Sequence, residues 1–191
     1  MKLSEKQKVD IDIFYSELQK QFPQSELKEK NIFAEILEIP NYKIFDIVNE
    51  DGVNCGYFTF LELPNNTILI DYIAIFNEFH SKGYGSKTFD CMKNELNYLG
   101  CYLEVEKENP QDINTIRRIN FYKKLGAKLL DINYIYPNIE GGLPMDLYFM
   151  SFKQNYFPKK DEILANIEFV FQKLHFDIPK NTEIFNRITA S

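Results

Sequence analysis

Two glycines before an expected helix form the segment of this chain that is best suited to chemistry. Gly83 and Gly85 follow an apolar run that ends at Ile75, and a helical pattern begins at Lys87. The first turn of a helix presents backbone N–H groups that lack partners, at the positive end of the helix dipole. Glycine lets a ligand approach such a backbone closely. The spacing therefore predicts a phosphate-binding loop that needs no basic side chain.

Two common phosphate-binding motifs do not fit this loop. A Walker A loop requires glycine directly before its lysine and again five residues earlier, but both positions before Lys87 are serines. A dinucleotide-binding fingerprint requires a third glycine where Thr88 stands. Residues 80–85 match a third pattern, Gln/Arg-x-x-Gly-x-Gly/Ala, except that His80 occupies its first position.

A second motif lies near the expected end of a later helix. Residues 121–127 read Phe-Tyr-Lys-Lys-Leu-Gly-Ala, close to an aromatic-Tyr-x-Lys-Leu-Gly-Phe signature. Together with the strand-like residues 71–75 before the loop, the chain resembles the GCN5-related N-acetyltransferase (GNAT) family over residues 22–152. His80 and Ala127 depart from the family pattern, but neither change removes a backbone N–H group.

The resemblance and the order of elements imply a mixed α/β (α+β) fold. We expect a mixed, mostly antiparallel central sheet flanked by helices and splayed between the strands Thr67–Ile75 and 102–106. The length of 191 residues fits a single domain, 1–191. Its acetyltransferase core would be 22–152, and 156–191 would form a C-terminal extension with an amphipathic helix at 159–174.

Local patterns predict the elements around the loop. Strands are expected at Tyr42–Val48, 53–63 and Thr67–Ile75, because β-branched and aromatic residues dominate there. Ser4 and Gln7 have the spacing of a capping box, which predicts a helix from Ser4. Gly100 is expected to cap the helix that follows the loop.

The resemblance implies acetyl-CoA as cosubstrate. The backbone of residues 82–86 would hold the pyrophosphate, and the backbone edge at Ile73 to Ile75 would pair with the pantetheine arm like an added strand. The residues expected to bind the coenzyme are Ile73, Ala74, Ile75, His80, Ser81, Lys82, Gly83, Tyr84, Gly85, Ser86 and Asn114.

Transfer to an amine needs a proton donor and a base. The resemblance places Tyr122 beside the coenzyme sulfur as the general acid, and the pKa of a phenol is near enough to that of a thiol for this role. The strand glutamate that some family members use as base is Leu69 here. Asp71 faces the same side of the strand and is a possible base. A water relay and three further carboxylates also stay open: Glu62, Glu104 and Glu106.

The composition limits the other classes of function. A net charge of −6 argues against nucleic-acid binding. The three cysteines form no CxxC pair and there are two histidines, so we expect no metal site. The N-terminal residues do not resemble a signal peptide, and no apolar run reaches the ~20 residues of a membrane span. We expect a cytoplasmic monomer or homodimer.

These observations predict an acetyl-CoA-dependent N-acetyltransferase that transfers acetyl directly to a primary amine of a small molecule or peptide. The first alternative is a non-catalytic acyl-CoA-binding sensor on the same fold. The absence of the strand glutamate at Leu69 favours this alternative. The second is an interaction protein or toxin whose helix at 159–174 packs on a partner.

Overall fold

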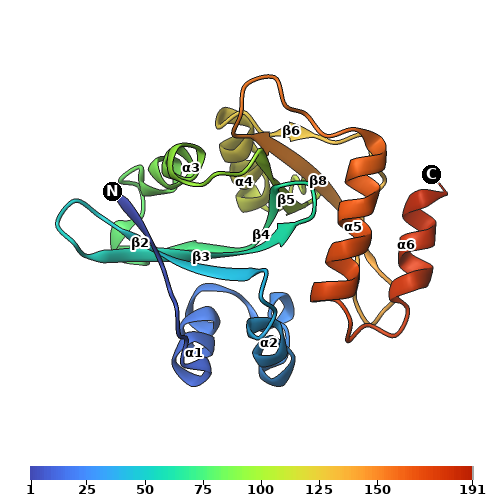
Figure 1. Cartoon of the computed structure of the whole chain (residues 1–191), viewed down its shortest axis with the longest axis horizontal. Coiled ribbons are helices and arrows are strands. Elements are labelled where there is room, and N and C mark those ends of the chain that lie inside the picture. Colours follow the sequence, from blue (N-terminus) through green and yellow to red (C-terminus); the bar gives the residue numbers. More distant parts are fainter. Residues whose placement is uncertain (191) are drawn as a thin grey trace.

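The structure is a computed structural model that describes residues 1–190. Within them, one mixed sheet carries helices on both faces (Figure 1). The strands are β1 Lys2–Glu5, β2 Tyr42–Val48, β3 Asn54–Leu63, β4 Thr67–Ile75, β5 Gly100–Glu106, β6 Lys128–Leu129, β7 Ile135–Tyr136 and β8 Leu143–Ser151. The α-helices are α1 Ile11–Gln21, α2 Lys30–Leu37, α3 Tyr84–Glu95, α4 Ile113–Lys124, α5 Lys160–Leu174 and α6 Asn181–Thr189.

The sheet is mostly antiparallel, as predicted. Its order is β1-β2-β3-β4-β5-β8-β6, and β7 pairs with β8. β4 and β5 form the parallel pair, because α3 carries the chain back to the same end of the sheet between them. This β4–α3–β5 unit holds the glycine loop at its first turn.

The sheet splays between β4 and β5, which confirms the prediction. Only residues 68–70 of β4 pair with residues 101–103 of β5, although both strands continue further. On the other side, Ile70 pairs with Phe60 and Tyr72 with Thr59, so Asp71 is an extra, unpaired residue in β4. Such a bulge bends a strand and increases its twist. β4 therefore leaves β5 at the position of Asp71.

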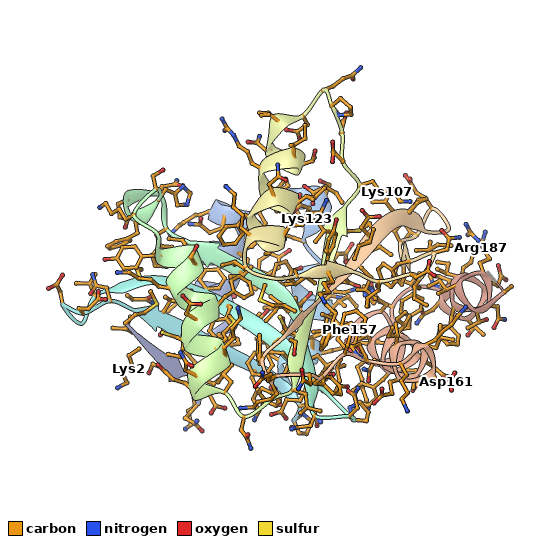
Figure 2. All side chains as sticks on the ribbon, turned by 90° about the horizontal axis from the view of Figure 1, so that it is seen from above. Lys2, Lys107, Lys123, Phe157, Asp161 and Arg187 are labelled. Carbon is orange, nitrogen blue, oxygen red and sulfur yellow. The ribbon has the colours of Figure 1, made fainter. Side chains whose placement is uncertain are left out.

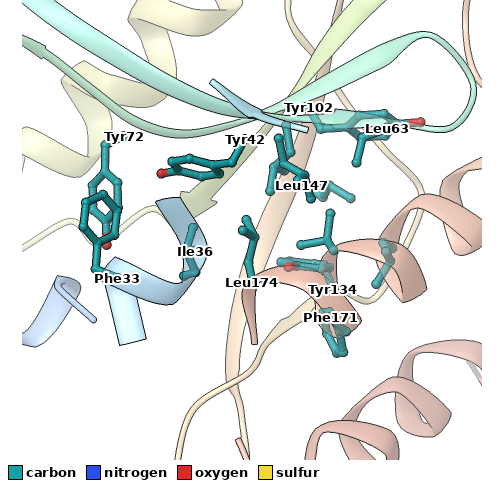
Figure 3. Packing of buried hydrophobic residues seen from close by; sticks show 14 of the residues in the cluster. Phe33, Ile36, Tyr42, Leu63, Tyr72, Tyr102, Tyr134, Leu147, Phe171 and Leu174 are labelled. Atoms are coloured by element: carbon teal, nitrogen blue, oxygen red, sulfur yellow. The ribbon is translucent and has the colours of Figure 1, made fainter. Parts of the chain in front are cut away.

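Each face of the sheet has its own apolar core. One core packs the sheet against α1, α2, α5 and α6. Figure 3 shows this core, with Phe33 and Ile36 from α2 on one side and Phe171 and Leu174 from α5 on the other. The second core lies under α3 and α4 and includes Phe89. The splayed strands are thus held from both faces.

The C-terminal helices belong to the first core. The predicted apolar face of α5 is buried and contains Ile163, Ile167, Val170 and Leu174. This face is covered by the chain itself, so it is not available to a partner. α6, which the sequence analysis did not predict, packs beside α5 (Figure 1).

Two local predictions were wrong. The helix expected from Ser4 begins at Ile11, because Asp10 is the N-cap and accepts hydrogen bonds from the N–H groups of Asp12 and Ile13. Ser4 instead pairs with Asp46 in the sheet. Gly100 does not cap α3, which ends at Glu95, but begins β5.

Candidate active site

The glycine loop ends in an open helix N-terminus. Gly83 has a left-handed backbone with φ of 79°, a conformation that glycine adopts without strain, and it precedes α3 with no side-chain cap. The first N–H groups of α3 therefore stay available to an anion. Gly85 faces α4, and a Cβ there would lie 3.2 Å from the Phe121 ring. Figure 2 looks down on the face that carries these two helices.

A cavity of about 510 Å³ lies against this loop, and we name it the loop cavity. Its walls come from β4, the loop, the start of α3, and Phe121 and Tyr122 of α4. It contains most of the residues expected to bind the coenzyme: Ile73, Ile75, His80, Ser81, Gly83, Tyr84, Gly85 and Ser86. Its position fits a ligand that runs from the helix N-terminus to the edge of β4.

A second cavity, of about 390 Å³, opens where β4 and β5 diverge, and we name it the splay cavity. Asp71 and Ala74 of β4 line it, with Glu104 of β5 and Glu26 from the connection between α1 and α2. The two cavities share four residues: Ile73, Ile75, His80 and Tyr122. Tyr122 therefore stands at the boundary between the two cavities.

Tyr122 keeps its proton at neutral pH. Burial raises the pKa of its phenol to about 12, and the nearby charge of Arg118 opposes this rise. The ring packs edge-on against Phe89 with the ring centres 6.0 Å apart. A positioned phenol that stays protonated is suited to donate a proton rather than to accept one.

Asp71 is fixed by a chain of hydroxyl groups. Tyr42 Oη lies 2.6 Å from Asp71 Oδ2 and 2.8 Å from Thr59 Oγ1. A phenol has one proton and a carboxylate is the stronger acceptor, so Tyr42 donates to Asp71 and accepts from Thr59. Burial raises the pKa of Asp71 to about 6, against the lowering effects of Tyr42 and Lys28. Asp71 is thus ionised at neutral pH but can take up a proton.

Glu104 faces the same cavity from β5. Its carboxylate accepts a hydrogen bond from the hydroxyl of Tyr134. The pKa of Glu104 is raised to about 7: burial is the largest cause and the charge of Asp71 adds to it, while the hydrogen bond from Tyr134 and the charge of Lys28 oppose the rise. The other two candidate bases lie outside both cavities: Glu62 accepts from Tyr98, and Glu106 pairs with Arg118 at 2.6 Å. The structure therefore brings Asp71 and Glu104 together.

The remaining predicted residues lie around the loop cavity or away from it. Lys82 Nζ donates to the carbonyl of Glu78 at 2.7 Å. His80 Nε2 lies 2.6 Å from the carbonyl oxygen of Ile75, so this nitrogen carries the proton and donates. Asn114 is exposed in the first turn of α4 and lines neither cavity. Ala74 lines the splay cavity only.

Two residues of the site gave no signal in the sequence. Glu26 enters the splay cavity from a connection that lies 45 residues before Asp71. Tyr42 belongs to β2, and its role depends on a long-range contact. An alternating strand pattern predicts that such a tyrosine faces the core. It does not predict which carboxylate accepts a hydrogen bond from its hydroxyl.

Neither a metal centre nor a membrane span is found in the described part of the chain. Residues 1–190 contain no group of three or more His, Cys, Asp or Glu side chains placed to hold a metal ion. In the same range, no helix combines the length and the apolar character needed to cross a membrane.

Comparison with known proteins identifies the family. The acetyltransferase (GNAT) family matches residues 11–127, which is more than half of the chain. The chain therefore belongs to the GNAT acetyltransferase family, as its motifs indicated. Comparison with curated protein sequences finds no match.

Solved structures share the fold. A GNAT-family acetyltransferase from Bacteroides thetaiotaomicron is 23% identical, with a TM-score of 0.72 over 91% of this chain and 99% of that one. The ribosomal-protein-S18-alanine N-acetyltransferase from Escherichia coli is 18% identical, with a TM-score of 0.58 over 82% and 99%. An aminoglycoside 6'-N-acetyltransferase complexed with coenzyme A is 13% identical, with a TM-score of 0.56 over 83% and 100%.

Proposed function

We propose that this protein transfers acetyl from acetyl-CoA directly to a primary amine of a small molecule or peptide, in the cytoplasm. The observation that carries this proposal is the shared wall of the two cavities. Tyr122 of α4 and Ile73 and Ile75 of β4 line both the loop cavity and the splay cavity. One cavity suits the coenzyme and the other suits the acceptor.

The loop cavity fits the coenzyme. The uncapped start of α3 offers N–H groups to a pyrophosphate, and Gly83 supplies the backbone turn. β4 no longer pairs with β5 beyond Ile70, so backbone groups on that side can pair with an extended pseudo-peptide. Two solved GNAT structures contain coenzyme A in their complexes, which supports the same cosubstrate here.

Acetyl-CoA, when bound, supplies an acyl group that is activated as a thioester. Asp71 is the base in this proposal. It takes a proton from the ammonium group of the acceptor, so that the neutral amine can attack the thioester. Tyr122 is the acid and gives its proton to the departing sulfur. None of the three cysteines lines either cavity, so the proposal uses no cysteine nucleophile. The acetyl group thus moves in one step between two bound partners.

The test is a thiol-release assay on an amine panel with the Tyr122→Phe variant. We expect turnover to fall about 100-fold, the lower end of the contribution of a general acid, while the affinity for acetyl-CoA is retained. Tyr148→Phe is the matched control, because Tyr148 is a buried tyrosine that lines neither cavity. Unchanged turnover in Tyr122→Phe would exclude the proposed role. Coenzyme binding by the wild type without thiol release would favour the sensor instead.

A further inference from the structure

The splay cavity has an unbalanced charge. Two cationic residues line it, and both already have carboxylate partners: Lys20 pairs with Glu17, and Arg118 pairs with Glu106. Three carboxylates also line it, namely Glu26, Asp71 and Glu104. Among residues 1–190, none of these three forms an ion pair with Lys, Arg or His. The cavity therefore presents a net negative wall.

The nearest further cation is held elsewhere. Lys28 is close enough to lower the pKa of both Asp71 and Glu104. Its ammonium nitrogen, however, lies 3.0 Å from Asp177 Oδ1 in the connection between α5 and α6. The two side chains are 11% and 22% exposed, so this ion pair is well shielded from water. Lys28 thus forms an ion pair between the N-terminal and C-terminal parts of the chain, and it leaves the cavity carboxylates without a cationic partner.

Two partly buried carboxylates in one cavity disfavour each other's ionised form. The pKa of Glu104 shows this effect, since the charge of Asp71 raises it, and burial raises the pKa of both groups. A cationic ligand would reverse the effect, because it supplies the missing opposite charge. The cavity is complementary to positive charge, and it offers no free cation to the carboxylate of an amino acid.

The two carboxylates have different positions. Asp71 lies on β4, two residues before the edge residue Ile73 that both cavities share. Glu104 lies on β5, across the splay, where Tyr134 holds it. The cavity wall also has an apolar part, because Ile70 and Leu103, which directly precede the two carboxylates on their strands, line it. A methylene chain can lie on this wall while each end meets a carboxylate.

We propose that the acceptor is an aliphatic amine with a second cationic nitrogen, a diamine or a longer polyamine. Asp71 receives the nitrogen that is acetylated, and Glu104 holds the distal ammonium group. This inference rests on the proposed function of the splay cavity as the acceptor site. It assigns Glu104 to substrate specificity rather than to the chemical step.

The test measures binding directly, with the full chain and no coenzyme present. Calorimetry compares putrescine, a four-carbon diamine, with butylamine, its monoamine counterpart. We expect putrescine to bind roughly 10–100-fold more tightly, the range of a hydrogen bond to a charged group. Glu104→Gln should abolish most of this preference while butylamine affinity stays the same. Glutamine keeps an acceptor for the Tyr134 hydroxyl, and thermal unfolding verifies that the variant is folded.

Glu62→Gln is the matched control. Glu62 also accepts a hydrogen bond from a tyrosine, Tyr98, but it lies outside both cavities, so this variant should keep the preference for putrescine. Equal affinity of the wild type for the two amines would overturn the proposal, and this result does not depend on any variant. A preference that survives in Glu104→Gln would also overturn it.

The thiol-release assay separates this inference from the proposed function. Selective binding of putrescine without acetyl transfer would refute the function and keep the binding site. Acetyl transfer to butylamine and putrescine with equal kcat/KM would keep the function and overturn the assignment of Glu104.

Discussion

Asp71→Asn is expected to make the protein more stable and less active. Burial holds the pKa of Asp71 at about 6 in the folded chain, against an ordinary value of 3.8. A carboxyl group with a raised pKa favours folding below about pH 4, and this contribution is lost as the pH rises through about 6. At pH 7.5 the ionised Asp71 therefore costs the fold up to about 3 kcal/mol.

Asparagine removes this cost because it does not ionise, and its amide oxygen still accepts from Tyr42. We expect Asp71→Asn to be more stable than the wild type by about 1–3 kcal/mol at pH 7.5, or about 2–12 °C in Tm. The difference should shrink toward pH 4.5, where Asp71 is mostly protonated in the wild type. Thermal unfolding at the two pH values measures it, and the same variant should lose turnover in the thiol-release assay.

The matched control is Asp46→Asn. Asp46 pairs with Lys6 at 2.8 Å on the outer part of the sheet, so its replacement should lower stability at pH 7.5 by about 1 kcal/mol or less. The reasoning on Asp71 would be refuted if Asp71→Asn were less stable than the wild type at pH 7.5. It would also fail if the stability difference were the same at both pH values.

Two further predictions concern the loop and the C-terminal helices. Gly85→Val should abolish the binding of acetyl-CoA in calorimetry, because a β-branched side chain next to the Phe121 ring would fill the space beside the helix N-terminus. Retained affinity would mean that the coenzyme binds outside this loop. Asp177→Asn should lower the free energy of unfolding in urea, by an amount between the roughly 1 kcal/mol of an exposed pair and the roughly 3–5 kcal/mol of a buried one. A double-mutant cycle with Lys28→Met isolates the pair, and no coupling would contradict the contact.

Local chemistry was sufficient to predict β4 and a helix after the glycine loop, although α3 begins at Tyr84 rather than at Lys87 and ends at Glu95. The nine residues of β4 are apolar nearly throughout, apart from Asp71, and the structure has the same limits. The glycine loop and the end of α4 could also be predicted from neighbouring residues, because a left-handed glycine or a helix cap depends on only a few of them. Gly126, for example, closes α4 with φ of 93°.

Long-range pairing explains the predictions that failed. The Ser4–Gln7 spacing favours a helix cap, yet Ser4 gains hydrogen bonds from the sheet because residues 2–5 add to the edge of β2. Side chains along β4 point to alternate faces of the sheet, and this order is interrupted at Asp71. The bulge there depends on the register with β3. The sequence of β4 alone does not contain that register.

The splay cavity depends on such non-local contacts more than the loop cavity does. Asp71 is held by Tyr42 from β2, and Glu104 is held by Tyr134, thirty residues later in the chain. Both carboxylates can therefore be recognised as candidate bases from the sequence, but the sequence does not show that they share one cavity or that Glu62 lies elsewhere.

The bulge at Asp71 connects fold and proposed chemistry. The bend exposes the backbone edge of β4 to the loop cavity, opens the splay from β5, and turns the Asp71 carboxylate toward Tyr42. One irregularity thus serves both proposed binding spaces.

A crystal structure with bound coenzyme A tests the central claim most directly. The account predicts the pyrophosphate on the backbone N–H groups of residues 82–86, the pantetheine arm along β4 at Ile73 to Ile75, and the sulfur beside the Tyr122 hydroxyl. Coenzyme A bound outside the loop cavity, or with its sulfur away from Tyr122, would contradict it.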